Sequence, residues 1–225
     1  MKLAIMQPTF LPWIGYFSMI SKADKFILLD NVQFNKRSWQ QRNKIKAKND
    51  SLLLTVPVIT KGLISQNIKD VKINNSEKYI EKHITSITHL YRKTKYFNDY
   101  SEKVFEIYRQ KLPLLSELNI AFIKLFCEIF NIKTNIFKAS SINISGKKES
   151  LLVDICKYYD AKIYLSAPGS SNYLTKTNLF EINNIMIEYF QYDHPVYQQI
   201  NGDFIPYLSI IDLLFNEGEN GIRYI

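Results

Sequence analysis

The residues best suited to chemistry gather in one polar and aromatic block, residues 30–44. Asp30 follows a short apolar run, and a carboxylate there can hold sugar hydroxyls, bind a metal, act as a base or only cap a turn. Arginine offers a planar fork for phosphate oxygens, lysine a point charge and tryptophan a stacking face. The block therefore predicts a site for a small anionic or sugar-like ligand. Its predicted ligand-binding members are Gln33, Lys36, Arg37, Trp39, Arg42 and Asn43. The competing interpretation is a solvated hairpin with Trp39 in the core.

Histidine supplies the candidate bases, and the chain has three. His194 follows a predicted strand and precedes Tyr197, which we include as a ligand contact, so it is the leading general-base candidate. The alternative is a histidine that fixes a turn by hydrogen bonds. His83 suits a catalytic role as well as it suits a buried residue with satisfied hydrogen bonds. His83 and His89 fall on different faces of one predicted helix, so they form no two-histidine metal site, and we expect no metal ligand set.

Three predicted strand ends position further candidates. Residues 2–6 form an apolar run that ends at Gln7, and a loop framed by prolines then leads to Gly15 and Tyr16 at a helix start, which can attract an anion. The strand at residues 161–166 ends in a polar turn that can bind phosphate through backbone N–H groups. The candidates at this turn are Ser166, Gly169, Asn172 and Tyr173. Because ligands of open α/β sheets bind outside the carboxyl ends of the strands, these ends predict one wall of the site.

The order of elements predicts the fold. Short apolar runs bounded by Gly, Pro and Asn alternate with helical segments, which is typical of an α/β fold with a mainly parallel, Rossmann-like sheet. Apolar residues at helical spacing, interrupted by Pro113, predict that residues 76–131 are helical. Neither a repeat nor a flexible linker is visible. We therefore expect one α/β domain, residues 1–225, with a helical insertion at 76–131.

Composition narrows the class of protein. The chain has 225 residues and a net charge of +8, which favours an anionic partner. Basic runs are short and no nucleic-acid-binding motif is present, so an anionic small molecule ranks above nucleic acid. Two cysteines without metal spacing, no signal peptide and no long apolar segment predict a cytoplasmic protein without a transmembrane span. Neither a P-loop nor a nucleophile elbow is found, which argues against those reaction classes.

Four phrases of the sequence carry a family resemblance. In order along nearly the whole chain they are QPTFLPWIGYF, DNVQFNKRSWQQRNKI, KIYLSAPGSSNYL and FIPYLSIIDLLFNEG. Together they resemble the WbqC-like protein family, which is found in bacterial O-antigen and other surface-polysaccharide gene clusters. The resemblance implies a sugar-related role but no general reaction. Ala167 stands where the pattern has glycine before Pro168, which weakens the case for phosphate contact at that turn. Asp212, in the last phrase, is expected to cap the helix or pair with a cation.

A second resemblance concerns architecture alone. A strand, a proline-containing loop and a glycine-aromatic helix start are similar to nucleotidyltransferases with a His-x-Gly-His signature. The matching residues here are Trp13, Ile14, Gly15 and Tyr16, so both histidines are missing. The resemblance therefore implies a nucleotidyltransferase-like fold but does not support nucleotidyl transfer by the usual residues.

These observations favour a transferase that acts on a nucleotide-activated or lipid-linked sugar in surface-polysaccharide biosynthesis, by acyl or aminoacyl transfer to an amino sugar. Lys36, Arg37 and Arg42 would hold the diphosphate, Asp30 and Asn43 the sugar hydroxyls, and a histidine would act as base. The alternative is a non-catalytic protein that binds sugar nucleotides or assembles the polysaccharide machinery. The sequence identifies no cofactor, and it leaves a homodimer open.

Overall fold

The chain forms two compact units, each assembled from three separate stretches of sequence. The computed structural model describes residues 1–63, 65–76, 78–144, 146–175 and 178–225. Unit 1 consists of Met1–Gln7, Ser18–Asn31 and Lys133–Asp193, and unit 2 of Pro8–Phe17, Val32–Ile132 and His194–Ile225. Residues distant in sequence therefore meet inside each unit. The assignment of residues 1–225 to one domain with an insertion at 76–131 stays a prediction.

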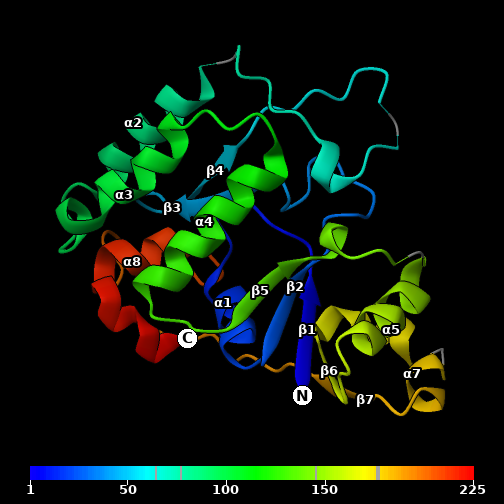
Figure 1. Cartoon of the computed structure of the whole chain (residues 1–225). Helices are drawn as coiled ribbons and strands as arrows, with labels where there is room; N and C mark the ends of the chain where they lie inside the picture. The colour runs from blue at the N-terminus through cyan, green and yellow to red at the C-terminus, as the bar shows by residue number, and fades with distance from the viewer. Residues whose placement is uncertain (64, 77, 145, 176–177) are drawn as a thin grey trace. The chain divides into compact units, whose positions relative to one another are not determined.

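Unit 1 is built on a five-stranded sheet whose neighbouring strands are all parallel (Figure 1). In spatial order its strands are β5 (Asn135–Lys138), β2 (Lys25–Leu28), β1 (Lys2–Met6), β6 (Ile163–Ser166) and β7 (Met186–Tyr189). The predicted α/β class with a mainly parallel sheet is confirmed. From the centre, the order runs outward through β2 to β5 on one side and through β6 to β7 on the other. Such a reversal of order creates a crevice at the carboxyl ends of the two central strands.

Apolar side chains explain why the central strands form. Leu3 and Ala4 of β1 and Phe26 and Ile27 of β2 have no exposed surface. Continuous apolar runs of this kind are typical of parallel strands buried on both faces. The pairing continues past the strands, because the backbone N–H of Leu29 donates to Met6 O at 2.8 Å. The register therefore brings the residues after β1 and after β2 to the same edge of the sheet.

The helices of unit 1 are short apart from one. They are η2 (Ala139–Ser141), α5 (Lys148–Tyr158), η3 (Pro168–Ser170), α6 (Ser171–Leu174) and α7 (Leu179–Ile182). Helix α1 (Ile14–Ser21) has residues in both units. Helix α7 packs against β7 and α5, and Phe180 of α7 stacks on Tyr164 of β6 with ring centroids 5.2 Å apart.

Unit 2 is mainly helical around a small antiparallel sheet (Figure 1). Its elements are β3 (Arg42–Lys46), β4 (Ser51–Thr55), η1 (Ile68–Asp70), α2 (Tyr79–Tyr91), α3 (Phe97–Arg109), α4 (Leu115–Ile129), α8 (Ile210–Glu217) and η4 (Gly218–Tyr224). Helix α3 packs against α2, α4 and α8, and α8 also contacts β3. The helices predicted on either side of Pro113 are confirmed. In the part of the chain that the structure describes, no helix has the length and apolar character needed to cross a membrane.

Three segments differ from what their local sequence patterns predict: the alternation of residues 70–75 favours a short strand, the last helix is expected to begin at Pro206, and Ser76 is expected to cap the helix that follows it. The segment at residues 70–75 forms single bridges, Val58 with Ile73 and Lys72 with Leu114, in place of a strand. The closing helix begins at Ile210 rather than near Pro206, because the Ser209 side chain accepts from Ile211 N and caps the helix there. Ser76 does not cap α2, since Lys78 precedes that helix and the Ser76 hydroxyl donates to Asn74 Oδ1 at 2.6 Å.

Candidate functional site

The predicted site residues divide between the two units. Unit 1 holds the residues at the ends of its parallel strands: Gln7, Asp30, Ser166, Gly169, Asn172 and Tyr173. Unit 2 holds the others: Gly15, Tyr16, Gln33, Lys36, Arg37, Trp39, Arg42, Asn43, His83, His194 and Tyr197. Each group forms its own arrangement, and the geometry within each decides which side chains can reach a ligand.

In unit 1, Gln7 follows β1 and Ser166 ends β6, the two strands at which the sheet order reverses. Ser166 is fully buried, and its hydroxyl is hydrogen-bonded to that of Ser170, which itself donates to Ala167 O. The Ser166 hydroxyl is thus part of the turn. A Cβ added at Gly169 would meet nothing within 4 Å, so the backbone there is open to approach. The side chains of Asn172 and Tyr173 lie outside the described part of the structure.

Asp30 fixes the end of β2 to the segment after β5. It is 2% exposed, and its oxygens accept from Ser140 N at 2.8 Å and from Ser140 Oγ at 2.6 Å. Both donors belong to a residue 110 positions away, so Asp30 connects two strand ends instead of capping its own turn. The next side chain differs, because Asn31 Oδ1 is buried with no hydrogen-bond partner among the described residues. An unsatisfied buried acceptor costs about 1–3 kcal/mol, so a ligand hydroxyl or a water molecule would stabilise it. Asn31 is a candidate that the sequence interpretation missed.

In unit 2, residues 33–42 form a loop, loop 33–42, whose backbone is held by two buried amide side chains. Gln40 Oε1 accepts from Asn35 N at 2.9 Å, and Gln41 Oε1 accepts from Arg37 N at 3.0 Å. Gln41 Nε2 also donates to Val56 O at 3.2 Å. Gln40 and Gln41 are 2% and 5% exposed, so these bonds are shielded from water. The loop therefore has a fixed conformation, although no helix or strand forms in it before β3 begins at Arg42.

The ligand-binding types on loop 33–42 point outward. Trp39 is 53% exposed, which rules out the interpretation that places it in the core. Its backbone is nevertheless fixed, since Trp39 O accepts from Phe10 N at 3.0 Å. The side chains of Gln33, Lys36 and Arg37 are exposed, and that of Arg42, the first residue of β3, is half-buried. The structure thus brings an exposed indole together with basic side chains on one rigid loop.

Asn43 and a residue that the sequence interpretation missed, Asn119, fix the neighbouring loop. Asn43 Nδ2 donates to Leu11 O at 2.7 Å and to Phe10 O at 3.2 Å. Asn119 is fully buried on α4, and its Nδ2 donates to Pro8 O at 3.1 Å and to Gln40 O at 2.8 Å. Asn43 therefore acts on the backbone in this structure. In the sequence, the sign of Asn119 is an amide among the apolar residues of one helix face.

Gly15 and Tyr16 belong to packed structure. A Cβ at Gly15 would lie 2.1 Å from the Trp13 ring, so the glycine makes room for the indole. Tyr16 is 1% exposed, and burial raises the pKa of its hydroxyl well above the usual value. The Trp13 ring therefore covers the start of α1 at Gly15, where the sequence predicts an anion.

Of the two candidate bases, His83 is enclosed and His194 is half-buried. His83 is 5% exposed between Phe10, Tyr79 and Tyr108, and burial lowers its pKa to about 4. The ring is therefore neutral at neutral pH. Its Nδ1 lies 3.3 Å from the Tyr108 hydroxyl. Such a site matches the buried, satisfied histidine of the two alternatives.

His194 fixes the loop in which it lies, residues 194–207, called loop 194–207. Its Nε2 accepts from Tyr207 N at 3.0 Å, and its Nδ1 lies 2.8 Å from Pro195 O, an acceptor, so Nδ1 carries the proton. Its ring is stacked on Trp13 with centroids 6.3 Å apart. Burial lowers the pKa of His194. Both ring nitrogens thus have backbone partners, which favours the turn-fixing role.

Asp212 is the most enclosed carboxylate described. It has no exposed surface, and it accepts from Tyr91 Oη at 2.8 Å, Tyr197 Oη at 2.7 Å and Gln199 Nε2 at 2.9 Å. Burial raises the pKa of Asp212, while these donors and the nearby Lys46 charge oppose the rise. Tyr197 is therefore engaged with Asp212. The network ties loop 194–207 to α2 and α8.

None of the described residues forms a group of three or more side chains of the types that bind a metal ion. The candidate ligand-binding groups are therefore two separate ones: loop 33–42 with Trp39 in unit 2, and the strand ends with Asn31 in unit 1.

Comparison with known proteins places the chain in a family. It is 31% identical over 226 residues to the uncharacterized protein Rv1507c of Mycobacterium tuberculosis (strain ATCC 25618 / H37Rv), and the match covers 100% of this chain and 97% of that protein. No solved structure matches significantly. The model of the WbqC-like protein family matches residues 7–224, so this chain belongs to the WbqC-like protein family.

Proposed function

We propose that this protein is a transferase that acts on a nucleotide-activated or lipid-linked sugar in bacterial surface-polysaccharide biosynthesis, such as that of O-antigen. The observation that carries the proposal is the exposure of Trp39, at 53%, on a loop whose backbone is fixed by Gln40 and Gln41. An aromatic side chain is costly to leave in water unless it has a partner, and a rigid loop spares the ligand the entropy cost of ordering it.

The chemistry around Trp39 fits a sugar nucleotide. The indole offers a flat face for a base or for the apolar face of a sugar ring. Lys36 and Arg37 are exposed on the same loop, and their positive charges suit a diphosphate. Separately, in unit 1, Asn31 Oδ1 is a buried acceptor without a partner among the described residues, shortly after β2, and a hydroxyl of a ligand bound there could donate to it.

The reaction we propose is acyl or aminoacyl transfer to the amine of an amino sugar. The sugar nitrogen forms a bond to the acyl carbon, the bond from that carbon to its leaving group breaks, and the amine proton leaves with the departing group. An unprotonated amine is itself nucleophilic. Positioning of two bound substrates therefore accounts for the rate better than a base, since His83 and His194 are both engaged.

The second candidate is a non-catalytic protein that binds a sugar nucleotide or assembles the polysaccharide machinery. The same observation favours it, because the Trp39 loop accounts for binding and requires no chemistry. The two functions differ in turnover. Mass spectrometry of an amino-sugar nucleotide incubated with the protein and activated acyl or aminoacyl donors would show a mass increase only for the transferase.

The test of ligand binding is a melting-temperature screen with UDP-, dTDP- and GDP-linked amino sugars. We expect at least one of them to raise the melting temperature, and Trp39→Ala and Arg42→Ala to reduce that rise. Tyr158→Ala is the matched control, because Tyr158 is 58% exposed in unit 1, and it should keep the full rise. The absence of a shift with every sugar nucleotide, or an equal loss in Tyr158→Ala, would contradict the proposal.

A further inference from the structure

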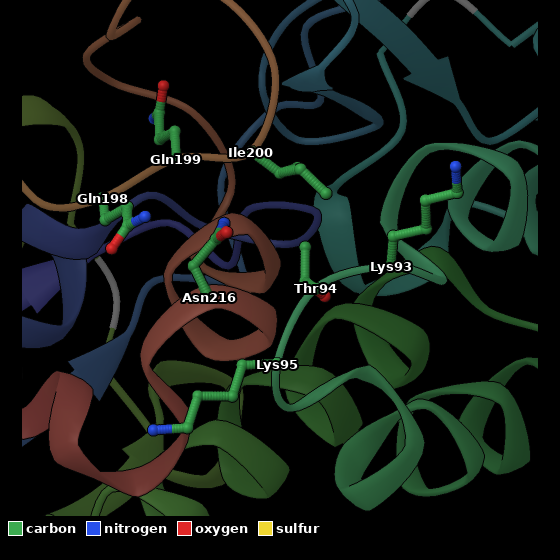
Figure 2. A pocket seen from close by; sticks show the side chains of 7 residues that line it. All are labelled: Lys93, Thr94, Lys95, Gln198, Gln199, Ile200 and Asn216. Carbon is green, nitrogen blue, oxygen red and sulfur yellow. The ribbon is translucent and has the colours of Figure 1, made fainter.

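A cavity in unit 2 is lined by none of the residues that the sequence predicted to bind a ligand. It has a volume of about 260 Å³ and is lined by Lys93, Thr94, Lys95, Gln198, Gln199, Ile200 and Asn216. Figure 2 shows Asn216 rising from α8 between two segments, one carrying the lysines and the other carrying the glutamines and Ile200. The volume is just below the usual range for ligand pockets, roughly 300–1,000 Å³, so the cavity suits a molecule of the size of one sugar ring.

The walls of this cavity are fixed by bonds to buried groups. Gln199 Nε2 donates to Asp212 Oδ2 at 2.9 Å, and Gln199 Oε1 accepts from Ile205 N at 2.8 Å. On the opposite wall, the Thr94 hydroxyl donates to Tyr91 O at 2.7 Å. Asn216 Nδ2 donates to Asp212 O at 2.7 Å. Both walls therefore depend on residues of the Asp212 network, and the cavity is formed before any ligand arrives, which lowers the entropy cost of binding.

The lining has a defined chemistry. Amide and hydroxyl groups of Gln198, Asn216 and Thr94 can accept and donate hydrogen bonds, as sugar hydroxyls require, and Ile200 offers an apolar surface for a ring face. The seven described lining residues include two lysines and no carboxylate. The pKa of Lys95 is raised by Tyr96 and, to a smaller extent, by Glu217. Glu217 is itself paired with Arg223 at 2.7 Å. Lys93 and Lys95 therefore bring positive charge to the mouth of the cavity.

The lysines extend at the rim of the cavity rather than into it. Both are exposed, and Lys95 Nζ lies over the Tyr96 ring, 4.8 Å from its centroid. Long side chains with exposed ammonium groups reorient at little cost, so a charged group at the mouth can draw both of them in. The anionic part of a ligand belongs at the mouth and its polar, uncharged part inside.

We propose that this cavity is a binding site for a monosaccharide phosphate, with the sugar ring between Asn216, Gln198 and Ile200 and the phosphate at Lys93 and Lys95. This cavity is a second site, distinct from the sugar-nucleotide site proposed on loop 33–42. Binding in the cavity does not involve Trp39.

The test is calorimetric titration of the full chain with the 1-phosphates of glucose, galactose, mannose and N-acetylglucosamine, with inorganic phosphate and the free sugars as comparisons. We expect at least one sugar phosphate to bind with millimolar or better affinity, and tighter than inorganic phosphate or its own free sugar. Lys93→Ala combined with Lys95→Ala should weaken that binding by about tenfold or more, since two phosphate contacts are lost. Asn216→Asp, which adds a negative charge to the wall, should also weaken it.

Lys103→Ala is the matched control. Lys103 is an exposed lysine of α3 whose Nζ lies 5.7 Å from the Tyr100 ring centroid, so it repeats the setting of Lys95 outside the cavity. It should bind the sugar phosphate as the wild type does. No saturable binding of any sugar phosphate, equal affinity for inorganic phosphate, or an equal loss in Lys103→Ala would overturn the proposal. None of these results depends on sugar nucleotides, so the outcome is separate from that of the proposed function.

Discussion

Loop 33–42 and loop 194–207 of unit 2 both carry amide and aromatic side chains, and the two loops use these side chains differently. In loop 33–42 the amides of Gln40 and Gln41 bind the backbone, while Trp39 is left exposed. In loop 194–207 the imidazole of His194 binds the backbone, and Tyr197 and Gln199 bind Asp212.

The two loops differ in which side chains can contact a ligand. A histidine with two backbone partners and a tyrosine bound to a buried carboxylate stabilise the fold. An exposed tryptophan on a fixed backbone contributes little to the fold and presents a flat face that a ligand could contact. The comparison predicts large stability effects in loop 194–207 and its partners, and large binding effects with small stability effects in loop 33–42.

The largest expected effect is at the centre of the network. Asp212→Ala leaves the donors of Tyr91, Tyr197 and Gln199 without their acceptor in a buried site, so we expect a loss of about 3–4 kcal/mol in the free energy of unfolding. Urea unfolding followed by circular dichroism measures it. Asp212→Asn keeps the shape and one acceptor oxygen and should lose less. An alanine variant as stable as the wild type would remove Asp212 from its central role.

The buried ring of His83 on α2 should make the free energy of unfolding depend on pH. Burial lowers its folded pKa to about 4 from 6.5, so the fold prefers the neutral ring. The stabilisation is complete above pH 6.5 and is lost as the pH falls from there through about 4. The expected loss is about 3 kcal/mol at the acid end.

Urea unfolding at a series of pH values checks this, since His83→Gln should remove that part of the slope. His89→Gln, which alters an exposed histidine of the same helix, is the control and should keep the wild-type slope. Parallel curves for the wild type and His83→Gln would show that the ring is not held neutral by burial.

Gln41 tests whether loop 33–42 is built as described. Gln41→Ala removes the bonds to Arg37 N and Val56 O, so we expect a loss of about 1–2 kcal/mol in unfolding free energy and weaker sugar-nucleotide binding. The exposed Gln110 at the end of α3 gives the control, Gln110→Ala, with neither effect expected. If Gln41→Ala changed neither quantity, the loop would owe its conformation to other contacts.

The smallest stability effect belongs to Trp39. Because half of its side chain is already in water, Trp39→Ala should lower the unfolding free energy by less than about 1 kcal/mol. Trp13→Ala should cost more, since the Trp13 ring covers Gly15 and stacks on His194. Thermal unfolding of the two variants side by side measures the difference. A reversal of their order would mean that Trp39 is a structural residue.

The sequence was informative where structure is local. The apolar runs of β1 and β2 predicted buried strands of a parallel sheet, and Pro113 predicted the break between α3 and α4. The resemblance in four phrases likewise agreed with the family match over residues 7–224.

The sequence was uninformative where long-range contacts decide. Tyr91 and Asp212 are 121 positions apart, so nothing near Asp212 revealed its partners. Whether Trp39 is exposed depends on Phe10 and Asn119, which bind the backbone beneath it from other parts of the chain. Asn43 has a residue type suited to binding a sugar and His194 one suited to catalysis, and only the geometry shows that both bind the backbone.

The fluorescence of Trp39 tests directly whether its indole contacts a bound sugar nucleotide. The chain has two tryptophans, so Trp13→Phe leaves Trp39 as the single indole. Titration of this variant with UDP-, dTDP- and GDP-linked amino sugars should give a saturable quenching or shift of its emission with at least one of them. The midpoint of that titration should match the binding constant of the wild type measured by calorimetry. Binding seen by calorimetry with no change in Trp39 emission, or no binding of any sugar nucleotide, would contradict the account.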